Sequence, residues 1–412
     1  MTTTINNKHN KLNFSSEREQ SQVCLNSAEH EKNQGRKVLN VPNLRFPEFE
    51  GEWEKCTLGE IGETIIGLTY KPTDVVANDG VIVFRSSNIQ NGMIDYSDLV
   101  RVNKIIKERI ITKKDDILVC ARNGSQRLIG KNAILKAEDS KNTFGAFMMI
   151  YRSNDNPFIH PLLSTKRYLS QVSENIGARI NQITTSDFNG FEFYFPTNHK
   201  ERRKIAGLFQ LLDERIATQS KVIEDLKKLK CAIAERLFKV TDGEVVALSD
   251  VCNVQKGKQV NGDCLSETGT YYVMNGGTEP SGYYEQYNAP AETISISEGG
   301  NSCGYVRYNR EAFWSGGHCY TLTDIQPNVC NLYLYHYLKS KESAIMKLRI
   351  GTGLPNIQKK DLEKFAVLLP PVSKQVRIST FLTAIERKTT NEETLLSHFQ
   401  EEKQYLLRQM FI

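Results

Sequence analysis

The sequence has no run close to the roughly 18 apolar residues that a membrane-spanning helix needs. Its polar start, MTTTINNKHNKLNF, also lacks the apolar segment of a signal peptide. The nine cysteines form no C-x-x-C pair and follow no regular spacing. We therefore expect a cytoplasmic protein whose cysteines are free thiols that pack in the fold. His318, Cys319 and the nearby Cys303 have no second close ligand pair, so we predict no metal site.

Motifs for catalysis are missing as well. Residues 124–131 have one residue too many between their glycines for a phosphate-binding loop, and Asn132 replaces the hydroxyl residue. Residues 156–158, Asn-Pro-Phe, contain one proline where an amino-methyltransferase motif has two, and residues 313–317 have the wrong spacing for its glycine-containing cofactor loop. We trust no cluster of carboxylates with lysine as a nuclease site. The sequence predicts a protein that is not an enzyme and binds no cofactor, and an enzyme acting alone is the less favoured alternative.

The main feature that is present is an internal repeat. Residues 176–238 return as residues 350–411, with IGARINQI matched by IGTGLPNI. A period of 173 residues is far longer than the roughly 20–50 residues of solenoid repeats, so a whole domain with its helix is duplicated. The matched apolar pairs include Ile205 with Ile378, Leu212 with Ile385, and Phe238 with Phe411.

Composition is that of an ordinary globular protein: 39% hydrophobic, 25% charged and 9% aromatic residues in a chain of 412. The net charge of +5 is mildly basic, which suits a nucleic-acid partner because lysine and arginine contact phosphates. Residues 1–40 are polar and show no apolar periodicity, which predicts a disordered extension. After it we predict a first domain over residues 41–198, a long helix over 199–242, a second domain over 243–372 and another long helix over 373–412.

Each predicted domain combines short strands with a helix. In the first, the runs ETIIGL, VIVFRSS, DDILVCA, AFMMIYR and FEFYFP alternate with turn residues, and residues 157–175 have helical spacing. The second repeats this order with VVALSDV, TYYVMNG, ETISIS, CGYVRYN, HCYTLTD and FAVLLPP, and with a helix over residues 328–348. This pattern is typical of an α+β fold, here two β-rich domains in tandem.

The two long helices have apolar residues at steps of three and four, and about 40 residues of helix extend about 60 Å. We expect the helices to pair antiparallel, related by a pseudo-twofold axis, and so to hold the domains at a fixed separation suited to a split DNA site. An oligomerisation or scaffold role for the helices is the alternative. The predicted pairing residues are Ile205, Leu212, Ile223, Leu226, Ile233, Leu237, Ile378, Ile385, Leu396, Phe399, Leu406 and Met410.

Several segments together resemble the specificity subunit of type I restriction-modification systems. They are PNLRFPEFEGEWEKCTLGEIG near the start, the IGARINQI and IGTGLPNI turns, FPTNHKERRKIAGLFQLLD and LPPVSKQVRISTFLTAIE, and the final LLRQMF. The resemblance covers residues 41–412 in the family's order of target domain, helix, target domain, helix. The departures are the N-terminal extension, Arg179 against Gly353, and Glu386 against Asp213.

The resemblance implies a non-catalytic subunit in which each target recognition domain reads one half of a bipartite site in double-stranded DNA. It implies helices that set the spacer and dock two methyltransferase (modification) subunits carrying S-adenosylmethionine. Restriction subunits, which use ATP and magnesium, would join them. The competing interpretation is a coiled-coil scaffold without sequence-specific DNA binding.

Arginine and lysine read guanine, and asparagine and glutamine read adenine, so we look for these residues in the turns of both domains. For the candidates in the first domain, the alternative is a solvated hairpin with a few positive charges. For the tyrosines among the candidates in the second domain, the alternative is a place in the core. His318 is expected to be packed rather than to contact DNA. The candidate DNA-binding residues are Arg85, Ser86, Asn88, Arg122, Asn123, Ser125, Gln126, Arg127, Lys131, Arg179, Gln182, Lys256, Lys258, Asn275, Thr278, Tyr283, Asn301, Arg307 and Tyr308.

Overall fold

The computed structural model describes residues 40–177, 181–351, 353 and 355–412, so the predicted extension over residues 1–40 lies almost wholly outside the described residues. The chain divides into two compact units. The first unit contains the chain up to Leu208 together with Tyr405–Ile412, and the second contains Phe209–Gln404. Both units combine strands with helices, which confirms the predicted α+β class.

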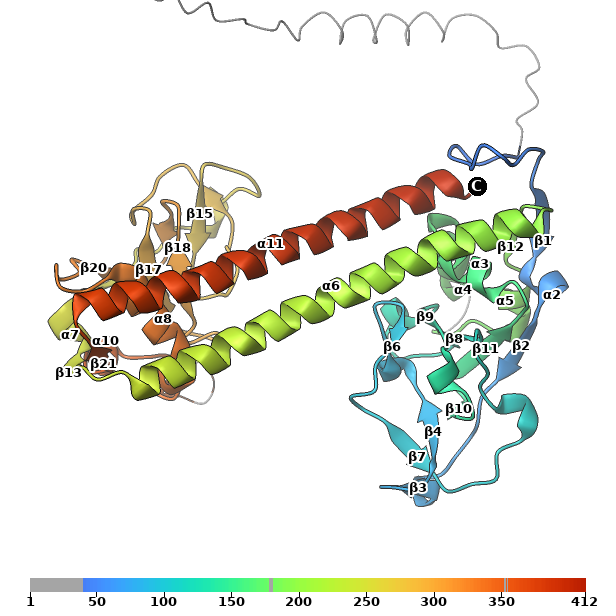
Figure 1. The fold of residues 1–412 in the computed structure, drawn as a ribbon, viewed down its shortest axis with the longest axis horizontal. Helices are drawn as coiled ribbons and strands as arrows, with labels where there is room; N and C mark the ends of the chain where they lie inside the picture. Colours follow the sequence, from blue (N-terminus) through green and yellow to red (C-terminus); the bar gives the residue numbers. More distant parts are fainter. Residues whose placement is uncertain (1–39, 178–180, 352, 354) are drawn as a thin grey trace, which may run out of the picture. The chain divides into compact units, whose positions relative to one another are not determined.

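The first unit is built around an antiparallel sheet with the order β2-β11-β8-β9. Its central strand β8 is buried along its whole length because both faces of the sheet are covered. A second sheet, β10-β4-β7-β3, pairs β10 with β4 in parallel, while β1 pairs with β12 and β5 with β6 (Figure 1). The strands are β1 (Glu54–Thr57), β2 (Glu63–Ile66), β3 (Val75–Val76), β4 (Val81–Phe84), β5 (Ile89–Gln90), β6 (Met93–Ile94), β7 (Val100–Val102), β8 (Ile117–Cys120), β9 (Asn132–Ile134), β10 (Thr143–Phe144), β11 (Met148–Arg152) and β12 (Glu192–Phe195).

The second unit repeats this architecture. Its main sheet has the order β14-β20-β17-β18, and the central strand β17 is again buried throughout. A smaller sheet, β16-β15-β19, corresponds to the second sheet of the first unit, and β13 pairs with β21 as β1 does with β12. The strands are β13 (Glu244–Ala247), β14 (Asn253–Lys256), β15 (Tyr271–Met274), β16 (Tyr283–Tyr284), β17 (Thr293–Ser297), β18 (Val306–Asn309), β19 (Trp314–Ser315), β20 (Cys319–Thr323) and β21 (Ala366–Leu369).

Short helices flank the sheets in both units. In the first unit they are α2 (Leu58–Ile61), α3 (Asn156–Leu162), α4 (Lys166–Gly177) and α5 (Thr185–Asn189), and in the second α7 (Leu248–Val251), α8 (Asn331–Ser340), α9 (Glu342–Met346) and α10 (Lys359–Glu363). Three predictions need correction here. The single helix expected over residues 157–175 is two helices. Thr165 lies between them, and its Oγ1 accepts the backbone N–H of Tyr168 at the start of α4. Residues 328–348 likewise form α8 and α9, and the end of VVALSDV is the helix α7, which begins where Asp250 accepts the N–H of Ala247.

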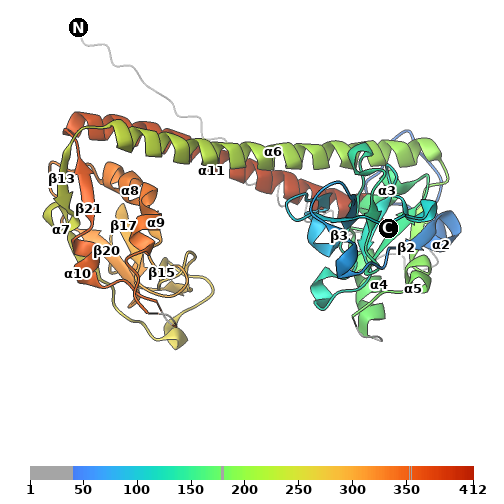
Figure 2. The same ribbon diagram turned by 90° about the horizontal axis from the view of Figure 1, so that it is seen from below.

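Two long helices, α6 (His199–Val240) and α11 (Val372–Met410), complete the fold. Their second-unit portions pair antiparallel: Asp213 contacts Lys403, Gln219 donates to the Glu392 carbonyl at 3.0 Å, and Lys230 lies 3.3 Å from Glu386. The residue numbers of the α11 partners fall as those of α6 rise, and Figures 1 and 2 also show the two helices running in opposite directions in this part of the chain. This confirms the predicted antiparallel pairing.

The predicted pairing residues are all at least half-buried, but several pack against a domain as well as, or instead of, the other helix. Ile205 is 1% exposed within the first unit. Ile233, Leu237 and Ile378 join the core of the second unit beside its strands. The amphipathic pattern therefore predicts burial correctly and predicts the burying partner only in part, because a stripe of apolar residues does not specify which surface covers it.

The start of α6 is anchored in the first unit by a buried carboxylate. Glu201 is fully buried and accepts hydrogen bonds from Arg45 Nε at 2.7 Å and Nη2 at 2.8 Å, and from Trp53 Nε1 at 3.3 Å. The Trp53 ring also packs edge-on against Phe158 and Phe411. The segment before β1 and the last residues of the chain thus meet in one buried cluster.

A buried histidine predicts how the second unit responds to acid. Burial lowers the pKa of His336 from 6.5 to about 4, and its Nε2 lies 2.8 Å from Thr383 Oγ1. The unfolded chain gains a proton near pH 6.5 that the folded chain does not take up until about pH 4, so the stability due to neutral His336 is fully present above pH 6.5 and is lost as the pH falls. We expect this to lower the free energy of unfolding by about 3 kcal/mol between pH 7 and pH 4.

Urea unfolding at pH 7, 5.5 and 4 measures this effect. The matched control is His336→Gln, which keeps a hydrogen-bonding side chain and does not titrate. Because carboxylates titrate equally in both proteins, the difference between wild type and variant isolates the histidine. Equal pH dependence of the two proteins would contradict the assignment.

Candidate nucleic-acid interface

The candidate residues Arg122 and Asn123 follow the central strand β8 almost directly and are held in place by two other segments. Arg122 forms an antiparallel bridge with Gln182, and the Ile183 N–H donates to the Ala121 carbonyl at 2.8 Å. Asn123 Nδ2 donates to Ser86 Oγ at 3.0 Å. Three stretches that are distant in the sequence therefore converge at one end of the main sheet.

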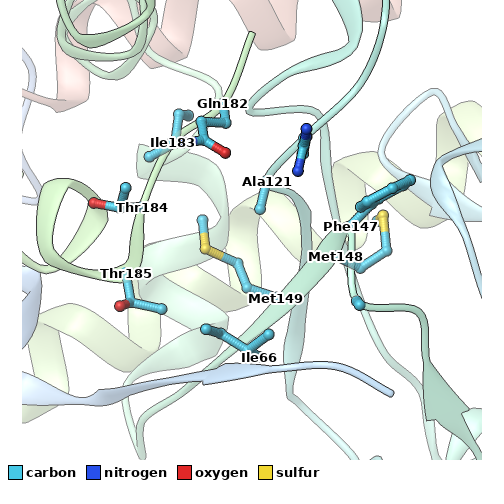
Figure 3. A pocket seen from close by; sticks show the side chains of 11 residues that line it. Ile66, Ala121, Phe147, Met148, Met149, Gln182, Ile183, Thr184 and Thr185 are labelled. Atoms are coloured by element: carbon cyan, nitrogen blue, oxygen red, sulfur yellow. The ribbon is translucent and has the colours of Figure 1, made fainter. Parts of the chain in front are cut away.

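A shallow hollow of about 350 Å³ lies at this end of the sheet (Figure 3). Its rim carries two large apolar side chains with high exposure, Ile66 at 59% and Phe147 at 61%. The Arg122 guanidinium lies over the Phe147 ring, 5.4 Å from its centre. The hollow is lined by Ile66, Ala121, Arg122, Ala146, Phe147, Met148, Met149, Gln182, Ile183, Thr184 and Thr185.

The strand register identifies the corresponding positions of the second domain. Val119 of β8 lies opposite Met149 of β11, as Ile296 of β17 lies opposite Tyr320 of β20. Further hydrogen bonds fix the loops. In the first domain the Ala121 N–H donates to the Phe147 carbonyl, and in the second the Glu298 N–H donates to the His318 carbonyl. The Ala121 carbonyl accepts the Ile183 N–H, and the Glu298 carbonyl likewise accepts the Ile357 N–H. The resulting pairs are Ile66 with Lys256, Ala121 with Glu298, Arg122 with Gly299, Phe147 with His318, Met149 with Tyr320, and Gln182 with Asn356.

These equivalent positions carry different chemistry in the two domains. Where the first domain has Ile66 and Phe147, the second has Lys256 and His318, with side chains 52% and 64% exposed. Glu298, 8% exposed, lies beneath them: its Oε1 accepts from Lys256 Nζ at 2.6 Å and from the Tyr320 hydroxyl at 3.1 Å. Its Oε2 lies 3.6 Å from His318 Nδ1. The same structural position is apolar in one domain and charged in the other.

The structure separates the other first-domain candidates into exposed and structural residues. Ser125, Gln126 and Arg127 are exposed beside the converging loops. Arg85 is paired with Asp98 at 2.7 Å, and Lys131 lies 3.5 Å from Gln90. Asn88 was predicted to contact a base, and its burial shows that this prediction is wrong. Arg179, another predicted contact, lies outside the described residues.

Asn88 is fully buried and all its polar atoms are used within the domain. Its Oδ1 accepts the Arg85 N–H at 2.9 Å, and its Nδ2 donates to the carbonyls of Asp95 and Asp98 at 3.1 and 2.9 Å. It therefore shapes the 3₁₀ turn Ser86–Asn88 and cannot reach a base. Asparagine side chains commonly hydrogen-bond the backbone of turns in this way.

In the second domain, Lys258, Thr278 and Asn301 are exposed, and Asn275 and Tyr283 are partly buried. Arg307 lies over the Tyr272 ring at 5.4 Å and donates to the Thr278 carbonyl at 3.2 Å. Tyr308 is partly buried, and its ring packs 5.4 Å from that of Tyr335 at the edge of the core. His318, expected to be packed, is exposed at the strand end.

The residues that sequence reasoning missed are mainly Ile66, Phe147, Glu298 and Asn356. Two of them are apolar, and nothing in the sequence separates an exposed isoleucine or phenylalanine from a core residue. They are identified by comparing the main sheets of the two domains position by position, and the strand register needed for that comparison is not contained in the sequence.

The basic start of α6 is largely neutralised within the first unit. Arg202 Nε donates to Asp155 at 2.9 Å, and Lys204 contacts Glu48. Two of the four cations of this turn are therefore already paired, whereas Lys200 and Arg203 are exposed. Among the residues that the structure describes, no helix is both long and apolar enough to cross a membrane.

Comparison with known proteins gives consistent matches. The family model for the type I restriction modification DNA specificity domain matches residues 50–228 and 241–398. A putative type I specificity subunit of Mycoplasma pneumoniae is 32% identical over 151 residues, 36% of this chain and 40% of that protein. The specificity subunit of the EcoKI type I restriction enzyme of Escherichia coli K12 is 28% identical over 194 residues, 44% of this chain and 41% of that protein.

The chain thus matches about two fifths of the length of these curated relatives. A crystal structure of a type I restriction-modification S subunit from M. genitalium is similar in fold, with a TM-score of 0.66 at 20% identity. That similarity covers 90% of this chain and 99% of the other.

Proposed function

The chain belongs to the type I restriction modification DNA specificity family, and from this membership we propose that it is a DNA sequence-specificity subunit whose two domains each read one half of a bipartite site. The observation that carries the proposal is the pair of equivalent sheet ends. One fold occurs twice, and the same exposed positions carry Ile66 and Phe147 in one copy and Lys256 and His318 in the other. Two copies with identical side chains would read one sequence twice, whereas these two present different groups to DNA.

The proposal includes no catalysis by this chain and no cofactor bound to it. Methyl transfer would belong to two modification subunits carrying S-adenosylmethionine, and translocation and cleavage to restriction subunits that use ATP and magnesium. The long helices would set the unread spacer and dock the modification subunits. Exposed apolar side chains on α6 and α11, namely Leu211, Leu229, Phe381 and Tyr405, are available for such contacts. Assembly would take place in the cytoplasm.

The test is to co-express the chain with its cognate modification subunit and to map adenine methylation across the host genome by single-molecule sequencing. We expect one split motif that disappears when the chain is omitted. Exchange of residues 53–195 for those of a relative with another specificity should alter one half of the motif and leave the other half unchanged. Methylation that does not change, in a complex shown to have assembled, would exclude the proposal and favour the coiled-coil scaffold.

A further inference from the structure

The equivalent sheet ends allow specific side chains to be assigned to base reading. Each domain presents two side chains that are more than half exposed, one from the end of the edge strand of the main sheet and one from the residue just before the neighbouring strand, β11 or β20. In the first domain these are Ile66 and Phe147, and in the second Lys256 and His318. Large apolar side chains are normally withdrawn from water, so two exposed ones in the lining of one hollow favour a surface that contacts a partner.

The second-domain pair is held in position by a buried carboxylate. Glu298 Oε1 accepts one N–H of the Lys256 ammonium at 2.6 Å, which leaves the other two N–H donors of that group free. The Tyr320 hydroxyl, which has one proton to donate, lies 3.1 Å from the same oxygen and 3.0 Å from the Ile357 carbonyl, so it borders the carboxylate on a second side. Glu298 is thus a positioning residue, and Lys256 and His318 are the groups presented to a partner.

The major groove offers a partner for each kind of pair. Guanine presents two acceptors there, N7 and O6, which lysine reads with its N–H donors, whereas thymine presents a C5 methyl group, which apolar side chains contact. A lysine and a histidine beside a buried carboxylate fit the first, and an exposed isoleucine with a phenylalanine ring fits the second. Arg122 over the Phe147 ring and Gln182 beside it supply polar contacts around the apolar pair.

Resting on the proposed function, we propose that these pairs are the base-reading side chains of the two domains. Ile66 and Phe147 contact the methyl group of a thymine in the first half-site, and Lys256 and His318 contact the N7 and O6 edge of a guanine in the second half-site. The difference between the two half-sites then comes from substitutions at equivalent positions of one sheet.

Base analogues test this with the full chain assembled with its modification subunit on a duplex carrying the mapped site. Uracil in place of thymine removes the methyl group, and 7-deazaguanine removes the N7 acceptor. We expect uracil at one thymine of the first half, and 7-deazaguanine at one guanine of the second half, each to weaken binding by about tenfold. Phe147→Ala should abolish only the first penalty, and Lys256→Met only the second.

Matched controls are Ile105→Ala and Lys364→Met, which alter exposed residues of the same two domains outside the pairs and outside the candidate DNA-binding residues. Both controls should keep both penalties. Each pair variant also contains its own control, because its other domain must retain wild-type sensitivity to the analogue. If Lys256→Met does not assemble, Lys256→Ala replaces it, since alanine also removes every side-chain N–H donor at this position.

The outcomes separate the two levels of the argument. If no methylated motif depends on the chain, the proposed function fails. If the motif exists but the analogue penalties persist in Phe147→Ala and Lys256→Met, DNA reading stands and this assignment of the reading residues is overturned. Penalties that vanish in the pair variants alone would establish it.

Discussion

Replacing Glu201 by alanine should lower the free energy of unfolding of the first unit by about 3 kcal/mol, because it removes a fully buried carboxylate and leaves the partly buried Arg45 guanidinium without its counter-ion. Glu201 is fully buried, and the Arg45 side chain is 15% exposed. The same substitution removes the acceptor of the Trp53 indole N–H. An unpaired buried donor adds to the penalty rather than reducing it.

The internal repeat supplies a control for this substitution. Lys374 occupies the position of α11 equivalent to Glu201 in α6 and is exposed. Lys374→Ala should therefore change stability by less than about 0.5 kcal/mol. Hydrogen exchange of β8 and β11 amides in increasing urea measures the first unit separately from the second. A loss below about 1 kcal/mol in Glu201→Ala would show that Arg45 regains its hydration, and would contradict a buried pair.

Truncation of either of two equivalent phenylalanines should lower the free energy of unfolding of one unit only, by about 3–5 kcal/mol. Phe411 and Phe238 are equivalent residues at the ends of α11 and α6. Phe411, 7% exposed, packs 5.7 Å from Phe158 in the first unit, and Phe238, 5% exposed, packs 5.3 Å from Tyr337 in the second. Truncation of either ring to alanine leaves a cavity in the core of that unit alone.

Hydrogen exchange followed peptide by peptide gives a crossed test. Phe411→Ala should reduce protection in β8 and β11 and leave β17 and β20 unchanged, whereas Phe238→Ala should do the reverse. Each variant is the control for the other, since both remove the same side chain from the same position of the repeat. Equal loss of protection in both units after either substitution would show that the two units unfold as one.

The sequence predicts the candidate site only where recognition uses charged or amide side chains. Arg122, Gln182 and Lys256 were predicted from residue type and lie at the equivalent sheet ends. Asn88 has the right residue type but is fully buried and taken up by internal hydrogen bonds. The prediction for His318 was wrong in the opposite direction, because a histidine between a glycine and a cysteine gives no sign of its exposure.

The sequence by itself determined the duplication, the α+β class and the two long helices. An insertion in a helix rotates the residues that follow it and so disturbs the apolar stripe. For this reason the two long helices keep one constant offset of 173 residues. Only the tertiary structure decided which residues of the two domains correspond. Ile66 and Lys256 are 190 residues apart, Ala121 and Glu298 are 177 apart, and Phe147 and His318 are 171 apart. Loops tolerate insertions at little cost, so the offset drifts from strand to strand, and hydrogen-bond register between strands is what restores the correspondence.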